Sequence, residues 1–144
     1  MNQPDPSPGQ DNDHDAAAYA AFTDGSSLLA SGNAHAAVIA LERARDLEPA
    51  KGSVRETLGR AYFRCRRFSD ARREFSRAVE LEPVNDYAHY GLGLTLHRVG
   101  DRVGARRHLK LAVAMRPLDE YRDALAQLPD APSSDDPQPD SAAG

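Results

Sequence analysis

Apolar residues in the middle of the chain recur at the spacing of one helix face, in two neighbouring segments. Residues 53–65 and residues 69–81 each keep apolar side chains three or four positions apart, with polar residues between them. That spacing is the period of an amphipathic α-helix. Pro83 follows the second segment, and the residue before a proline disfavours helical backbone. The pattern therefore predicts two short helices folded back on each other and ended by Pro83.

The pattern recurs with a fixed period of 34 residues. Proline stands at Pro49, Pro83 and Pro117, each 34 residues from the next. The same step connects three further sets of small residues: Gly25, Gly59 and Gly93; Ala37, Ala71 and Ala105; Ala44, Ala78 and Ala112. Self-similarity of this length is the signature of a repeat protein, in which each unit buries its apolar face against its neighbours. Three helical pairs are expected, over about residues 18–51, 52–85 and 86–119.

Local signals set the expected helix ends. The expected helices cover residues 18–31, 34–47, 53–65, 69–81, 86–99 and 102–115. Gly32 and Gly100 each follow the first helix of a pair, where a left-handed cap favours glycine. Arg66 occupies the same place in repeat two, and a positive φ there would cost about 1 kcal/mol. Asn33 and Asp101 are suited to cap the helices that begin after them.

Glycine inside the first helix of each pair indicates a close approach of two helices. Such a glycine costs roughly 1 kcal/mol relative to alanine, so it needs a packing reason. We expect Gly25, Gly59 and Gly93 to face Ala37, Ala71 and Ala105 of the second helices.

One more amphipathic segment follows the third repeat, at residues 118–128. Its apolar residues lie on or near one stripe: Leu118, Tyr121, Leu125 and Leu128. The last repeat of a stack needs a polar-backed cap to cover its apolar face. We interpret residues 118–128 as a capping helix, and an independent interaction helix is the alternative.

Both ends of the chain differ from this repeat body, which occupies residues 16–128. Residues 1–15 and 129–144 are rich in proline and aspartate and almost free of large apolar side chains. Such segments bury too little apolar surface to offset their ordering entropy, so both are predicted to be disordered acidic tails. Between residues 51 and 117 the balance reverses, with 15 basic against seven acidic residues.

The chain resembles tetratricopeptide-repeat (TPR) proteins over about residues 18–128. Repeat two carries the family pattern: Leu58, Gly59, Tyr62, Ala71, Phe75, Ala78 and Pro83. The family's tryptophan position holds Ala21, Arg55 and His89 instead. The resemblance implies an all-α fold, an alpha-alpha superhelix (TPR solenoid) of three helix-turn-helix repeats and a capping helix.

In this family the first helix of each repeat lines a concave groove. The matching positions are Tyr19, Phe22, Ser26, Glu56, Arg60, Phe63, Arg64, Tyr87, Tyr90, Leu94, His97 and Arg98. Aromatic side chains and arginine are the usual anchors of protein interfaces, and arginine pairs with carboxylates in a bidentate way. We hypothesise that a peptide or helix with apolar anchors and acidic residues binds there.

Other chemistry is not indicated by the residues. Some TPR proteins hold a chaperone's C-terminal carboxylate with a lysine/asparagine/arginine clamp, but the matching positions here are Phe22, Ser26, Arg60, Tyr87 and Gly91. The five histidines show no metal-ligand spacing, and Cys65, the single cysteine, excludes an internal disulfide. No catalytic constellation or phosphate loop is evident. We expect no cofactor, no metal and no enzymatic activity.

The sequence therefore favours a non-catalytic interaction module: an adapter, a scaffold or a client chaperone. A bacterial secretion-type TPR chaperone is an alternative, and the abundance of arginine and alanine suits a GC-rich bacterial genome. A nucleic-acid-associated factor is the alternative of another class, with Asp70 and Glu74 interpreted as surface residues that partly neutralise its arginines: Arg64, Arg66, Arg67, Arg72, Arg73, Arg77, Arg102, Arg106 and Arg107. Without an apolar leader or spanning segment, a cytoplasmic location is expected and a membrane partner is not.

Overall fold

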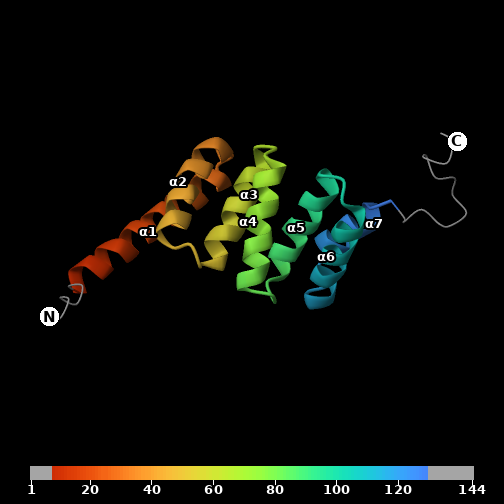
Figure 1. Cartoon of the computed structure of the whole chain (residues 1–144). Helices are drawn as coiled ribbons and strands as arrows, with labels where there is room; N and C mark the ends of the chain where they lie inside the picture. The colour runs from red at the N-terminus through yellow and green to blue at the C-terminus, as the bar shows by residue number, and fades with distance from the viewer. Residues whose placement is uncertain (1–7, 130–144) are drawn as a thin grey trace, which may run out of the picture.

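The computed structural model describes residues 8–129, which form seven helices and no strand. The helices are α1 (Pro8–Ala30), α2 (Ala34–Leu47), α3 (Gly52–Arg64), α4 (Phe68–Leu81), α5 (Asp86–Arg98), α6 (Arg102–Met115) and α7 (Asp119–Gln127). Figure 1 shows them standing side by side in chain order, from α1 at one end to α7 at the other. Within residues 8–129, every helix is too short or too polar to cross a membrane. The fold is the all-α solenoid expected from the repeats.

Three helical hairpins and one additional helix make up the stack. The hairpins are α1/α2, α3/α4 and α5/α6, and each packs on the next through α2 against α3 and α4 against α5. The short helix α7 packs on α6 at the C-terminal end. Tyr121 of α7 is buried among these helices, and so is Leu128 just beyond it. Helix α7 thus covers the face that the third hairpin would otherwise expose.

The helix bounds agree with the sequence prediction except at the N-terminus. Helices α2 and α6 have the predicted bounds, and the others after α1 differ by about one residue. Helix α1 begins at Pro8, so the prediction that residues 8–15 are disordered is wrong. Aspartates near its start suit the first turns of a helix. An existing helix also grows at little cost, here from the alanine run that follows at residues 16–18. Residues 1–7 and 130–144 of the predicted tails lie outside the described residues.

The expected turn geometry is present between the helices of each hairpin. Gly32 and Gly100 have positive φ values of 87° and 91°. Arg66 has a φ of 61°, which is the left-handed conformation that sequence alignment of the repeats required. The side chains of Asn33 and Asp101 accept hydrogen bonds from backbone N–H groups in the first turns of α2 and α6. Arg66 therefore carries a strain of about 1 kcal/mol that its glycine equivalents avoid.

Close approach within each hairpin is confirmed, and Gly93 faces the Ala105 backbone as expected, but the nearest atoms opposite Gly25 and Gly93 belong to leucine side chains. A Cβ atom added at Gly25 would lie 2.5 Å from a Leu41 side-chain atom, and one at Gly93 would lie 2.7 Å from Leu109. The predicted partners Ala37 and Ala105 are also fully buried. Side chains on a helix lean toward its N-terminus, so a residue one turn further along covers the place opposite the glycine.

Phe75 joins the second and third hairpins. Its side chain is 1% exposed and contacts Gly59 in its own hairpin. A Cβ atom added at Gly91 of α5 would collide with the same ring. Two glycines on two different helices therefore make room for one aromatic ring, which fixes how α5 lies against α3 and α4.

Replacing Phe75 with alanine should lower the free energy of unfolding by about 3–5 kcal/mol, because a large buried side chain is lost and the cavity cannot collapse fully. Urea denaturation followed by circular dichroism measures the change. Val84→Ala is the matched control, since Val84 is 82% exposed; it should change the free energy by less than about 0.5 kcal/mol. Equal stability of the two variants would contradict the assigned role of Phe75.

Candidate functional site

The twelve residues predicted to line the groove lie on the first helices of the three hairpins. They divide among α1, α3 and α5, and every one of them keeps at least part of its side chain exposed. Seven of the twelve line one of two cavities at opposite ends of the stack. The other five border neither cavity: Ser26, Glu56, Arg60, Arg64 and Tyr87.

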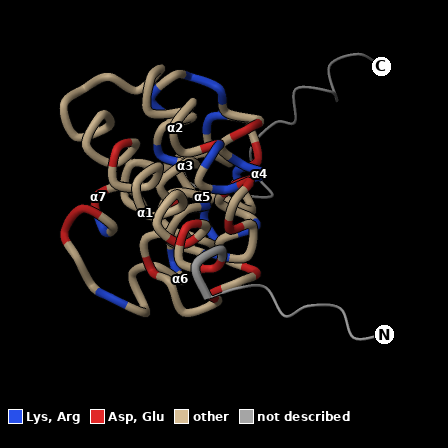
Figure 2. Tube along the Cα trace, turned by 90° about the vertical axis from the view of Figure 1, so that its left-hand side faces the viewer, with Lys and Arg blue, Asp and Glu red and all other residues tan. Residues whose placement is uncertain are grey.

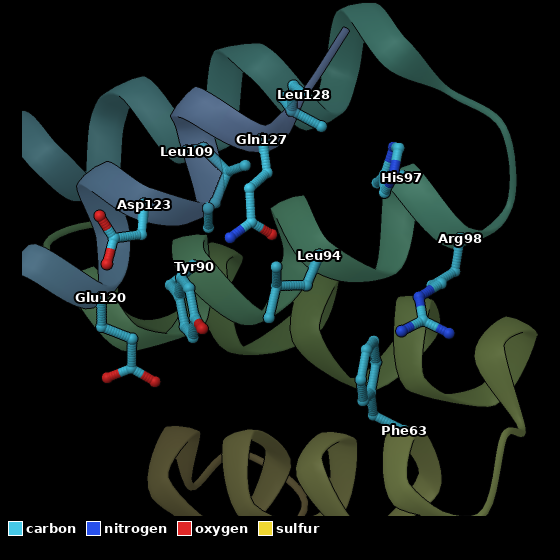
Figure 3. A pocket seen from close by; sticks show the side chains of 11 residues that line it. Phe63, Tyr90, Leu94, His97, Arg98, Leu109, Glu120, Asp123, Gln127 and Leu128 are labelled. Atoms are coloured by element: carbon cyan, nitrogen blue, oxygen red, sulfur yellow. The ribbon is translucent and has the colours of Figure 1, made fainter.

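The C-terminal cavity has a volume of about 540 Å³ and lies between α5 and α7 (Figure 3). Five of the predicted groove residues line it: Phe63, Tyr90, Leu94, His97 and Arg98. The opposite wall comes from the end of the chain, mainly from Glu120, Asp123, Ala124, Gln127 and Leu128. Sequence reasoning assigned these residues only to a cap and missed that they form half of the cavity.

The two walls of this cavity differ in charge. Figure 3 shows Arg98 and His97 on one side of Leu94, and Glu120 and Asp123 on the other. The cavity thus has an apolar centre between a basic side and an acidic side. Recognition of a ligand by such a surface depends on the order of charges along the ligand.

The N-terminal cavity is smaller than the C-terminal one. Its volume is about 400 Å³, and Tyr19 and Phe22 are the predicted groove residues that line it. The remaining lining includes Asp15, Glu48 and Lys51. Tyr19 is 71% exposed, so its ring is available for contact with another molecule.

Arginine side chains near the groove lie over aromatic rings. The guanidinium carbon of Arg98 is 5.5 Å from the centre of the Phe63 ring, and that of Arg60 is 5.2 Å from the centre of the Tyr87 ring. Stacking holds a guanidinium group in place while its N–H edge stays available for a carboxylate. Arg64 differs, because its Nη1 donates a hydrogen bond to the backbone oxygen of Leu29 at 2.9 Å.

Tyr90 belongs both to the cavity and to the contact with α7. Its ring stacks on Tyr121 with centres 4.7 Å apart, and the Tyr121 hydroxyl donates to Asp86 at 2.6 Å. Burial, together with the nearby Glu120, raises the pKa of Tyr90 to about 12. Tyr90 therefore keeps its proton at neutral pH and can donate a hydrogen bond into the cavity.

A buried ion cluster joins the first two hairpins. Glu74 is 1% exposed, and its two carboxylate oxygens accept from Arg45 at 3.0 Å and from Arg55 at 2.9 Å. The interpretation of Glu74 as a surface residue is wrong, because α4 turns this position toward α2 and α3. Arg55 occupies the family's tryptophan position, and that exchange is the signal that could have revealed the cluster.

The third hairpin has histidines at the equivalent positions. A step of 34 residues takes Arg55 to His89 and Glu74 to His108. The His89 and His108 Nδ1 atoms are 3.0 Å apart, and His89 Nε2 lies 2.8 Å from the Pro83 oxygen. Since Nε2–H donates to Pro83, His89 Nδ1 accepts the proton of His108. Sequence reasoning missed this pair.

The histidine pair does not extend into a metal site. Among residues 8–129, no group of three or more His, Cys, Asp or Glu side chains is arranged to hold a metal ion. Burial, and then the neighbouring His89 and Arg107, lower the pKa of His108 to about 4. The His108 ring is therefore neutral at physiological pH.

Several known proteins are similar to this chain. The model of the TPR repeat family matches residues 59–100. The first TPR domain of Spaghetti (RPAP3), bound to the HSP90 peptide SRMEEVD, has a TM-score of 0.74 and 19% identity, and the match covers 77% of this chain and 89% of that one. The Arabidopsis OM64 TPR domain has a TM-score of 0.76 and 16% identity, with 80% and 96% covered.

A third structure is the second TPR domain of human RPAP3 in complex with the HSP70 peptide SGPTIEEVD. Its TM-score is 0.75 at 15% identity, and the match covers 80% of this chain and 97% of that one. No curated protein has a significantly matching sequence. At these identities the structural matches establish the fold, and the repeat match places the family's sequence signature on α3 to α5.

Replacing Glu74 with glutamine should lower the free energy of unfolding by about 3–5 kcal/mol, because two arginines would share a site that has lost its anion. Chemical denaturation measures the change. Glu80→Gln is the matched control, since Glu80 pairs with Arg77 on the surface; it should cost less than about 1 kcal/mol. Similar losses in both variants would show that the cluster contributes no more than a surface pair.

Acidification should destabilise the fold through His108. Because its folded pKa lies below the ordinary value of 6.5, the unfolded chain binds more protons between pH 6.5 and about 4, and stability falls as the pH is lowered through this range. His108→Asn keeps a donor toward His89 and does not titrate, so its stability should fall less. The thermal midpoints of both proteins at pH 4.5 and 7 test this. Identical pH dependence would contradict it.

Proposed function

Because the chain has the fold of tetratricopeptide-repeat proteins and a match to the repeat model over residues 59–100, we propose that it is a non-catalytic protein-interaction module that binds a peptide or a helix of another protein in its concave groove. The support is the preformed C-terminal cavity, which combines an apolar centre with oriented charges. Two structures with this fold hold short peptides. An adapter, a scaffold or a client chaperone would act in this way, without chemical turnover.

The ligand we propose carries three features in sequence. An apolar side chain fills the centre of the cavity, against Phe63 and Leu94. A carboxylate on one side of that anchor pairs with Arg98, whose guanidinium is held by stacking. A lysine or arginine on the other side meets Glu120 and Asp123. The hypothesis of an acidic ligand is thus refined to a ligand with both charges in a fixed order.

The acidic peptides bound by the related structures are not the ligand we propose. Both end in EEVD. The positions that would match the carboxylate clamp of such proteins hold Phe22, Ser26, Arg60, Tyr87 and Gly91, with neither lysine nor asparagine. An internal segment of a partner fits the cavity better than a chain end, because the cavity presents a cation on one side only.

Nucleic acid is not favoured as the partner of the groove. Three of the arginines around α4 that could meet phosphates are already paired, Arg67 and Arg73 with Asp70, and Arg77 with Glu80. Figure 2 shows basic and acidic segments next to each other around α4. The narrower roles suggested by the sequence, a bacterial secretion-type chaperone and a cytoplasmic location, stay predictions.

Selection from a display library of random peptides tests the proposal. Enriched peptides should share an acidic residue, an apolar residue and a basic residue in one order, and Arg60→Glu with Arg98→Glu should weaken their binding at least tenfold, or about 1.4 kcal/mol. Arg64 is left unchanged, since it holds the Leu29 carbonyl.

The matched control is Arg72→Glu with Arg116→Glu, which makes the same change of charge at two exposed arginines outside the groove. It should leave the affinity for the peptide unchanged when both proteins are measured at the same salt concentration. Equal loss in both double variants would reduce the interaction to net charge. A library that yields no binder at all would reject the proposed function.

A further inference from the structure

Helix α6 differs from every other described helix in its charge. It carries four basic side chains and no carboxylate: Arg102, Arg106, Arg107 and Lys110. Three of these, Arg102, Arg106 and Lys110, are four residues apart and so lie along one stripe of the helix. None of the four forms an ion pair with any residue between positions 8 and 129. The contrast with α4 is direct, because three of the arginines on or beside α4 have carboxylate partners.

The chain leaves the folded domain at the middle of this stripe. Leu128 is 8% exposed and anchors the end of α7 in the core. The backbone oxygen of the next residue, Pro129, accepts a hydrogen bond from Arg106 Nη2 at 2.6 Å. The last described residue thus lies beside Arg106, with Arg102 and Lys110 one turn away on either side. The C-terminal tail is defined here as the residues that follow, 130–144.

We propose that the C-terminal tail docks in cis on the α6 stripe and shields it from polyanions. The tail contains Asp130, Asp135, Asp136 and Asp140 and no basic residue. The cations of α6 and the carboxylates of the tail are thus complementary in sign and equal in number. Pro129, the residue before the tail, already contacts the docking surface, so no long linker has to be closed.

The length of the tail suits the stripe. Arg102 and Lys110 are eight residues apart on a helix, which is about 12 Å. Ten residues of extended, proline-rich chain reach about 31 Å, so the segment from Asp130 to Asp140 spans the stripe with slack. Pro132, Pro137 and Pro139 restrict the free tail and lower the entropy lost on docking.

Shielding follows from competition within one molecule. A tethered tail has an effective concentration of the order of millimolar at its docking surface. Four neighbouring cations that form no ion pair within residues 8–129 would otherwise attract nucleic acid through the release of counterions, without regard to its sequence. The docked tail therefore keeps α6 from non-specific polyanion binding and leaves the cavity between α5 and α7 open to a protein ligand.

The first test measures polyanion binding by the full-length chain. The probe is a fluorescein-labelled oligothymidylate of about 20 nucleotides, followed by anisotropy at low and at physiological salt, where electrostatic contacts differ most. Changing all four tail aspartates to asparagine should tighten binding at low salt at least tenfold. Adding Arg102→Glu and Lys110→Glu, two changes within the stripe, should abolish that gain. Equal affinity of the unmodified and the asparagine chains overturns the proposal.

The second test locates the tail directly. A spin label is attached at Ser141→Cys in a Cys65→Ser background, and broadening of backbone amide signals is recorded by NMR. We expect broadening along α6 at low salt, and its loss at high salt or in the asparagine chain, since screening weakens exposed ion contacts. Broadening confined to α5, or none, overturns the proposal.

A mixed sample separates docking in cis from contact between two molecules. Spin-labelled chain without ¹⁵N is mixed with ¹⁵N-labelled chain that has no spin label. Broadening of the α6 amide signals in this mixture would come from a second molecule and overturns docking in cis. Failure of this inference is distinct from failure of the proposed function, because the peptide library reports on the groove and the oligothymidylate on α6.

Discussion

The contact between glycine on the first helix of a hairpin and a large apolar side chain on the second determines the geometry of the whole stack. Gly59 of α3 and Gly91 of α5 both pack against the ring of Phe75, which belongs to α4. This one ring therefore sets both the distance within hairpin two and the distance to hairpin three. The groove and its C-terminal cavity depend on it, because their positions follow from the spacing of α3 and α5.

The sequence predicted the solenoid well because its signals are local and repeated. Glycine, proline and the apolar period mark each helix end, and even the positive φ of Arg66 follows from its alignment with Gly32 and Gly100. The start of α1 was not predicted. Low hydrophobicity indicates that a segment cannot form a core of its own, but such a segment can still extend a helix that is anchored further along the chain.

The candidate site was only partly predictable. Five of the predicted groove residues line the C-terminal cavity, but its acidic wall comes from Glu120 and Asp123, which lie beyond the repeats. Glu74 and His108 were also missed as interior residues, since their neighbours Arg45, Arg55 and His89 are brought together only by packing. A pattern of one polar residue among others does not distinguish a solvated side chain from a buried one with partners.

The unlike polar pairs between helices have a consequence for assembly order. Hairpins of similar shape could stack in the wrong sequence, with hairpin three placed directly on hairpin one. Arg45 of α2 would then meet the two histidine rings in place of Glu74. It would keep only the exposed Asp46 as a counterion and lose its buried carboxylate partner, which destabilises the misplaced stack. The arginine–glutamate contact between hairpins one and two and the histidine pair in hairpin three are thus not interchangeable. This difference favours a single order of hairpins in the stack.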